Sequence, residues 1–407
     1  MARGIPGVAR LSIGGEDGFA GSVSSWYDLE AFDYQRTNYA RDFVTFDDAV
    51  RGDLGPAGGM AGLCRQAELK IKTWAHGSGE NIEAEPDPLD SHLKPLYGAF
   101  GMRESSSRGA ATGVSGAHQG PASVVRVAQS QPAQFVQGGM MLFTDEANVR
   151  GLAAVLLIAQ DGDDTVLTLD RRLDQVYGMG AVTGLYGGRH FTLNTADPSV
   201  FATDSGLATL SVQQVDRNGF MKERFLGCVG TELSLSADKN QRVMLEAGFK
   251  AHKGESLAAA AGAAAFSRPV YLLASGLTVV ADGAPLARVS EAALCVKFTP
   301  AFVQDQCGDQ GRSGCIITKV EPTVKLVGLN TDTFAAFVSC FEGGSPMGLG
   351  IAFCGGPNPQ PGRSLGLYLP AVQVIDPYEV KDDKLQLRSV TLSALAAGPG
   401  NLVVSYC

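Results

Sequence analysis

The sequence has few of the residues on which metal centres and common active sites depend. No cysteine pair has the two-residue spacing of a zinc ribbon. The histidines are far apart, and none has a metal-ligand partner four residues away. They are His76, His92, His118, His190 and His252. These absences exclude the usual signatures of metal-dependent catalysis, so we expect no metal, no cofactor and no catalytic residue.

Two short segments resemble catalytic or cation-binding motifs only in part. Residues 113–118 contain a serine between glycines, but they lack the G-x-S-x-G spacing and a preceding apolar strand. Residues 161–164 are acidic, yet the EF-hand pattern is absent and a β-turn explains them. Neither segment supports an enzymatic interpretation.

Positive charge is also scarce. The chain has 33 Lys and Arg against 42 Asp and Glu, a formal net charge of −9. Tight binding of nucleic acid needs clustered basic residues that neutralise phosphates. The charge balance therefore argues against a shell that grips DNA or RNA, although it allows a surface past which DNA slides.

Long hydrophobic runs are missing as well. The longest apolar segments, residues 152–159 and 257–266, are far shorter than the roughly 20 residues of a membrane span. Residues 1–6 lack the apolar core of a signal peptide. We therefore expect synthesis in the cytoplasm and no membrane partner.

Eight cysteines are present, and several lie in apolar runs such as residues 292–298. A buried free thiol is a good small core residue, which favours reduced structural cysteines. Disulfides among Cys307, Cys315, Cys340 and Cys354 are the alternative.

What the sequence does contain is glycine and alternating strands. Its 51 glycines have no period, a pattern typical of many turns between short strands. Residues 9–13, 26–36 and 67–73 alternate like half-buried strands. Asp87 and Pro88 predict the start of a short helix with an apolar face, and Pro95 limits its length. The apolar face comprises Leu89, Leu93 and Leu96.

The middle of the chain interrupts this pattern twice. Residues 37–61 form a long excursion rich in Gly, Asp and aromatic residues. The Ser- and Gly-rich residues 105–120 are typical of a linker. After it, three strands separated by turn residues predict a small β-barrel inserted at about residues 125–190.

The second half repeats the order of the first. Residues 277–283 correspond to 11–18, residues 289–303 to 26–36, and residues 322–329 to 67–73, and a helix capped by Asn330 follows, ending at Gly343. We therefore expect a mainly β fold with two tandem sandwich or barrel units, each with one short helix. The expected boundaries are 1–124 with 191–255 for the first unit, 125–190 for the insert, 256–267 for a linker and 268–407 for the second unit.

Three segments carry a resemblance to a known family. They are a strand, loop and short helix at residues 68–101, a glycine-flanked hairpin and following strand at 223–249, and the C-terminal unit at 320–406. Together they resemble the major tail tube proteins of long-tailed bacteriophages, of the larger type with a duplicated tube domain. The resemblance implies β-sandwich units flanked by one helix, each lending a four-stranded sheet to a barrel around a channel.

The resemblance also implies partners and a location. Such proteins form stacked rings of six tube domains in the virion tail, through which DNA is ejected into the host. Two domains per chain then imply trimeric rings with pseudo-sixfold symmetry and about 24 strands, with a hexamer as the alternative. The other implied partners are the tape measure protein and DNA in the lumen, without specific binding, and tail terminator and baseplate proteins at the ends.

Two groups of residues are the candidate sites. Aromatic and charged residues in and beside the excursion suit a protein interface, and the resemblance assigns it to contact between rings, with a mobile surface loop as the alternative. These are Arg36, Tyr39, Arg41, Phe43, Phe46, Asp47 and Asp48. Acidic residues opposite Leu29, Leu69 and Leu233 are candidates for an acidic or neutral channel wall, although Lys70 and Lys72 share their side. These are Asp28, Glu30, Glu68 and Glu232.

Two other functions remain open. A tail terminator or a baseplate hub has the same fold as a tube subunit. A β-sandwich protein that binds or processes glycans would need an aromatic platform and an export signal, whereas the chain has only Trp26 and Trp74 as tryptophans.

Overall fold

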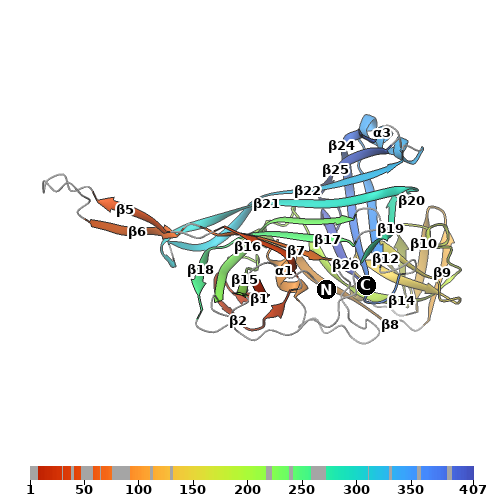
Figure 1. Cartoon of the computed structure of the whole chain (residues 1–407). Helices are drawn as coiled ribbons and strands as arrows, with labels where there is room; N and C mark the ends of the chain where they lie inside the picture. Colours follow the sequence, from red (N-terminus) through yellow and green to blue (C-terminus); the bar gives the residue numbers. More distant parts are fainter. Residues whose placement is uncertain are drawn as a thin grey trace.

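The chain folds mainly into antiparallel β-strands, with three short α-helices in the described part (Figure 1). The computed structural model describes residues 8–29, 31–37, 41–46, 58–64, 66–75, 92–110, 113–128, 132–216, 222–237, 242–257, 272–309, 311–329, 332–354, 359–382 and 387–407.

The first half contains, in order, β1 (Val8–Asp17), β2 (Ser22–Val23), β3 (Tyr27–Asp28), β4 (Ala31–Arg36), β5 (Arg41–Phe46), β6 (Gly58–Cys64), β7 (Glu68–Trp74), α1 (Leu93–Gly98) and β8 (Arg103–Ala110). The middle contains β9 (Val114–Gln119), β10 (Ala122–Val127), η1 (Pro132–Gln134), β11 (Met140–Asp145), β12 (Arg150–Asp161), β13 (Asp164–Leu169), α2 (Leu173–Tyr177) and β14 (Val182–Leu193). Then follow η2 (Pro198–Phe201), β15 (Leu210–Asp216), β16 (Lys222–Ala237), β17 (Met244–Lys250) and β18 (Lys253–Ser256). The second half contains β19 (Leu273–Ala281), β20 (Ala284–Pro285), β21 (Val289–Asp309), β22 (Arg312–Leu329), α3 (Asp332–Gly343), β23 (Met347–Cys354), β24 (Ser364–Asp382), β25 (Leu387–Leu395) and β26 (Leu402–Tyr406).

Eight of the described strands form one continuous layer, which we call the eight-stranded sheet. Its order is β4-β7-β17-β16-β21-β22-β25-β24. The joint between its two halves is the pair β16–β21, where Glu232 lies opposite Lys297 and Ala237 opposite Ala292. Each half thus supplies four strands in the same order: β4-β7-β17-β16, then β21-β22-β25-β24.

A second layer covers one face of this sheet. In the first half it has the order β3-β1-β15-β16-β18, and in the second half β19-β23-β24-β26. Two long strands, β16 and β24, therefore belong to both layers, one in each half. In β16 the backbone turns at Gly227, whose φ of 60° is in the region that favours glycine. The apolar core lies between the layers and includes Leu69, Leu233 and Leu294, each nearly fully buried.

The helix α1 lies inside the core of the first half. Its Leu93, Leu96 and Tyr97 are buried, and Pro95 is tolerated because it lies in the first turn. The Tyr97 hydroxyl lies 2.7 Å from that of Tyr406, which ties the helix to the C-terminal strand. The expected helix start, with Asp87 and Leu89, lies outside the described residues. The second expected helix is confirmed as α3, which ends at Gly343 as predicted.

The strands between β9 and β14 have a core of their own. They pair in the order β9-β10-β13-β12-β11-β14, and their buried cluster runs from Val114 to Leu185. The linker prediction for residues 105–120 is wrong, because β8 pairs with β14 and β9 pairs with β10. The boundaries expected near residues 125 and 190 fall within β10 and β14.

Three further expectations are corrected. The single strand expected at residues 26–36 is divided, since β3 pairs with β1 whereas β4 pairs with β7. The hairpin expected at residues 223–235 is wrong, because these residues belong to one continuous strand, β16. The excursion at residues 37–61 contains a two-stranded ribbon, β5–β6, which projects from the body in Figure 1.

Phe100 connects the two halves of the core. Its ring lies 5.3 Å from that of Phe249 on β17 and 5.1 Å from that of Phe298 on β21. Gly230 provides the space, because a Cβ there would lie 2.0 Å from the Phe100 ring. The amide of Gly230 also donates to the carbonyl of Ala99 at 2.8 Å.

Replacing Phe100 with alanine should strongly destabilise the monomer. The side chain is fully buried, so the cavity and the lost contacts should cost about 3–5 kcal/mol. Phe341→Ala is the control, since that side chain is 47% exposed and its loss should change stability by about 0.5 kcal/mol or less. Denaturant unfolding of both variants measures the difference, and equal midpoints would contradict it.

Candidate assembly surfaces

The face of the eight-stranded sheet turned away from the core is polar and, in the described residues, carries no covering layer. Side chains alternate across a strand, so every second residue points to this face. On β7, Leu69 and Ile71 are buried, whereas Glu68 is exposed and Lys70 is half-buried. Paired positions extend the face to Glu246 on β17, Glu232 and Ser234 on β16, Cys295 and Lys297 on β21, Glu321, Thr323 and Lys325 on β22, and Thr391 and Ser393 on β25.

Lysines and carboxylates on this face are paired across strands. Glu246 is nearly buried and forms an ion pair with Lys70. The Lys72 ammonium lies 3.4 Å from the other carboxylate oxygen of Glu246. Lys72 also lies 3.8 Å from Asp33 on β4. The hydrogen bond to Glu246 raises the pKa of Lys70. Each lysine is thereby held beside a carboxylate.

Opposite charges also face each other at the joint between the halves. Glu232 lies directly opposite Lys297. The Cys295 thiol donates to a Glu232 carboxylate oxygen at 3.6 Å, and burial followed by the Glu232 charge raises the pKa of that thiol. Further along, Lys319 and Glu321 form an ion pair at 2.8 Å. The face therefore carries both signs of charge in alternation.

The structure brings together only part of the expected acidic set. Glu68 and Glu232 lie on this face. Asp28 does not, because β3 belongs to the other layer and its carboxylate accepts from Arg10 and Ser12, both at 2.7 Å. Glu30 lies outside the described residues. Sequence reasoning missed Glu246 and Lys297, since their partners are distant in the chain.

The two ends of the eight-stranded sheet are open edges. Among the described strands, β4 pairs only with β7. The last part of β24, from residue 374 onward, pairs only with β25. An edge strand presents a row of unpaired N–H and C=O groups that another chain can pair with. These two edges are therefore candidate contact surfaces.

The ribbon β5–β6 is the third candidate surface. The structure places the backbone of Arg41, Phe43 and Phe46 on β5, while Tyr39, Asp47 and Asp48 lie outside the described residues. Arg36 is not a loose side chain at the ribbon's entrance. Its guanidinium lies 3.0 Å from the Glu223 carboxylate and 5.9 Å above the centre of the Phe225 ring. Arg36 thus anchors the end of β4 to β16.

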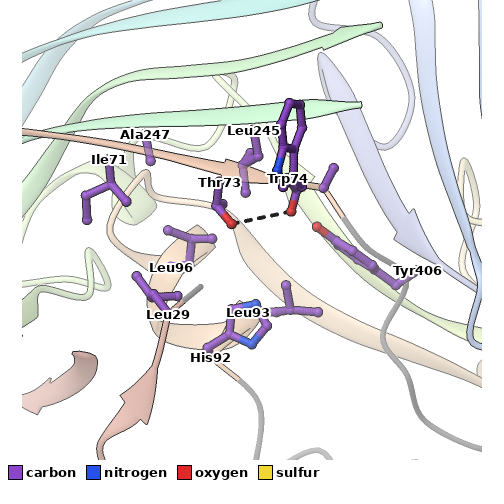
Figure 2. Close-up of a pocket in the computed structure, with 11 residues that line it drawn as sticks. Leu29, Ile71, Thr73, Trp74, His92, Leu93, Leu96, Leu245, Ala247 and Tyr406 are labelled. Atoms are coloured by element: carbon purple, nitrogen blue, oxygen red, sulfur yellow. Dashed lines mark hydrogen bonds between the residues drawn. The ribbon is translucent and has the colours of Figure 1, made fainter. Parts of the chain in front are cut away.

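A pocket beside α1 is part of the core. Figure 2 shows it between the helix and the strands β7 and β17, with Leu96, Ile71 and Leu245 on its walls. His92 and Thr73 are its main polar residues, and Thr73 donates to the Trp74 carbonyl at 3.4 Å. The lining offers no convergent set of charged groups for a ligand.

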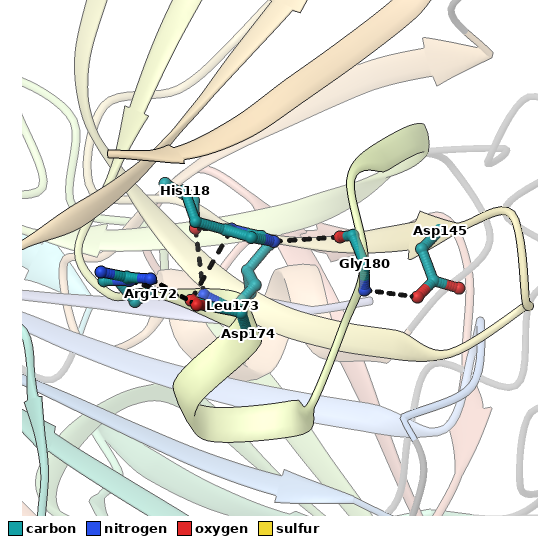
Figure 3. A network of polar contacts seen from close by, with 7 residues as sticks. His118, Asp145, Arg172, Leu173, Asp174 and Gly180 are labelled. Atoms are coloured by element: carbon teal, nitrogen blue, oxygen red, sulfur yellow. Dashed lines mark hydrogen bonds and ion pairs between the residues drawn. The ribbon is translucent and has the colours of Figure 1, made fainter. Parts of the chain in front are cut away.

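A network around His118 superficially resembles a catalytic triad (Figure 3). Ser123 Oγ lies 2.7 Å from His118 Nδ1, and Asp174 lies 3.8 Å from the same nitrogen. In a triad the serine and the carboxylate occupy opposite ring nitrogens. Here Nε2 lies 3.0 Å from the carbonyl oxygen of Gly180, and Ser123 is fully buried. The network therefore ties α2 and residue 180 to β9.

Other common site signatures were sought in the described residues. Six cysteines are free thiols: Cys228, Cys295, Cys315, Cys340, Cys354 and Cys407. No group of three or more His, Cys, Asp or Glu in this part of the chain is arranged to hold a metal ion. No helix in it is long and apolar enough to cross a membrane.

Comparison with known proteins places these surfaces in context. The model of the phage tail tube protein family matches residues 65–352. This span includes five of the eight strands, β7, β17, β16, β21 and β22, together with the insert, and it covers more than half of the chain. The chain therefore belongs to the phage tail tube protein family, a family of structural components of the virion tail. A comparison with curated protein sequences finds no match.

Replacing Glu246 with glutamine tests the pairing on the open face. Because Lys70 has a raised pKa when folded, its pairing stabilises the fold below the ordinary lysine pKa of 10.5 and is lost as the pH rises through the folded value. E246Q should lower the unfolding free energy by about 0.5–1 kcal/mol near pH 8, after solvent screening, and by less at alkaline pH. Glu321→Gln, in an exposed pair, is the control with a smaller effect. Denaturant titrations at several pH values would contradict this if the deficit grew with pH.

Proposed function

We propose that this tail tube family member is a structural, non-catalytic subunit that polymerises as stacked rings into the tube through which phage DNA is ejected. The observation that carries the proposal is the continuous eight-stranded sheet with one open polar face and two open edges. A sheet of this kind is an aggregation hazard in a monomer, whereas ring closure uses the edges as interfaces. The tape measure protein and DNA then occupy the lumen, and the tail terminator and baseplate proteins the ends.

Three chains per ring fit the strand count. Each chain supplies eight strands in two similar sets of four. Barrel width grows with strand number, and eight strands leave no channel. With strands about 4.8 Å apart, 24 strands give a circumference of at least about 115 Å and a backbone diameter of about 37 Å before tilt. That width leaves a channel for duplex DNA inside the side chains.

The open face suits a channel wall that does not hold DNA. In the proposed ring it lines the lumen. Its lysines have carboxylates as neighbours, so a phosphate that approaches Lys70 or Lys297 also approaches Glu246 or Glu232. Few counterions would be released per contact, and DNA affinity would stay low. The proposed wall is thus mixed and near neutral, which is the neutral form of the acidic or neutral wall that the net charge favoured.

Imaging tests the proposed assembly. Electron microscopy of the purified chain should show tubes, and a cross-section should contain three chains with pseudo-sixfold symmetry. The strands between β9 and β14 occur once per chain, so they should form three outer projections. Six equivalent chains or six projections would contradict the trimer. A few copies per purified virion, instead of dozens or more, would indicate a terminator or hub.

Removal of the ribbon tests ring stacking. We propose that the ribbon β5–β6 contacts the adjacent ring, because it projects beyond the body. Replacing residues 40–58 with a short Gly/Ser linker should leave folded subunits and single rings but no long tubes. Burial of apolar side chains such as Phe43 and Phe46 would contribute a few kcal/mol per contact. Long tubes from this variant, measured by electron microscopy, would remove the ribbon from stacking.

A further inference from the structure

We propose that β24 of one copy pairs antiparallel with β4 of the next copy, in the register that β16 and β21 already have within each chain. In this register Glu379 lies opposite Thr37 of the neighbouring copy. The inference rests on the proposed ring and adds to it the residue-level contact between subunits. It follows from matching irregularities in the two halves of the fold.

The strands that cross between layers have the same first bulge. In the first half, Leu210 on β15 lies opposite Cys228 on β16, and Val212 lies opposite Phe225. A step of two residues on β15 therefore matches a step of three residues on β16. In the second half the two-against-three pattern recurs between β23 and β24. The pairs there are Met347 with Val372 and Leu349 with Leu369.

A second bulge follows in both halves at the same spacing. On β16, Gly230 opposes Phe249 and Glu232 opposes Gly248, so Thr231 is the extra residue. Ile375, three residues after Val372 on β24, is the corresponding extra residue, as Thr231 is three residues after Cys228 on β16. The pairs there are Val374 with Leu392 and Asp376 with Thr391. These two bulges match β16 to β24 and β17 to β25.

The other two strands of each half match in the same way. Between β4 and β7, a bulge separates the pairs Ala31–Thr73 and Asp33–Lys72. Between β21 and β22, the corresponding bulge separates the pairs Val289–Gly328 and Glu291–Val327. A third bulge lies eight residues after Asp33 in the first half and eight residues after Glu291 in the second. In the first half it separates the pairs Arg41–Cys64 and Phe43–Ala61. In the second half it separates the pairs Thr299–Lys319 and Ala301–Ile316. Thus β4 with β5 corresponds to β21, and β6 with β7 to β22.

The joint within the chain can therefore be transferred to the open edges. Ser234 lies opposite Cys295 in the β16–β21 pair. Ser234 also opposes Glu246, whose counterpart on β25 is Ser389, and Ser389 opposes Glu379. Cys295 lies four residues after Glu291, as Thr37 lies four residues after Asp33. The counterpart of the Ser234–Cys295 pair is thus Glu379 with Thr37.

An exposed apolar side chain on β25, the neighbour of β24, also supports this occupant. Leu395 on β25 is 39% exposed and lies opposite Ala371. Its counterpart in the first half is His252, which is fully buried with its ring 6.1 Å from that of Phe302 on β21. The counterpart of Phe302 is Val44 on β5. A neighbouring copy seated on β24 would therefore bring its β5 over Leu395.

Disulfide trapping tests the register. The double variant Thr37→Cys with Glu379→Cys should give covalent dimers and trimers on oxidation of assembled protein. The off-register variant Thr37→Cys with Asp376→Cys should give about tenfold less, because its Cα atoms would exceed the disulfide limit of about 7 Å. Ser234→Cys is the matched control, since it should bond to the native Cys295 within one chain. The unmodified chain and each single-substitution variant are oxidised in parallel as further controls.

The outcomes separate the register from the proposed ring. Tubes that trap the off-register pair better, or neither pair, would overturn the register and leave the tube standing. Failure of the unmodified chain to form rings or tubes would overturn both. Hydrogen exchange on the unmodified chain gives a second test. Amides in residues 31–37 and 376–382 should gain protection on assembly, and unchanged exchange there would overturn the joint.

Discussion

The structure depends on one constraint: the backbone groups at the edge of a β-sheet need partners. Within the chain, β16 and β21 supply partners to each other and merge two four-stranded sets into one sheet. The outer edges of that sheet, β4 and the part of β24 from residue 374 onward, have no second strand among the described residues. The proposed joint between neighbouring subunits of one ring follows from completing these edges.

The long crossing strands link the core to the open face. The first part of β16 pairs with β15 and β18 over the core, and its last part carries Glu232 and Ser234 to the open face. A bulge at Gly227 and another near Thr231 make that change of layer possible. Because β24 has corresponding bulges, the core of each half fixes where its open face and its edge lie. Core packing and assembly geometry are thereby coupled through the same two strands.

Local patterns predicted the elements whose signals are local. Alternation indicated β7, and the apolar spacing with Gly343 indicated α3. Residues 105–120 were mistaken for a linker because small side chains were interpreted as flexibility, whereas Ser107 is buried where β8 pairs with β14. Asp28 was assigned to the wrong layer because a break between β3 and β4 has no strong turn residue. The partners of Lys70 and Glu232 depend on long-range register, which one sequence does not encode locally.

The two halves share bulges more closely than they share residues. Lys70 has Lys325 as its counterpart, but Glu232 has Asp376 and Gly230 has Val374. A bulge changes twist and register together, so moving one would turn a whole strand to the wrong face. Side chains can change while this geometry stays. Because two such units are joined in one chain, one of every two joints between neighbouring units is already formed before assembly begins. A free subunit then exposes one pair of edges per two units, which reduces the surface available for incorrect strand pairing.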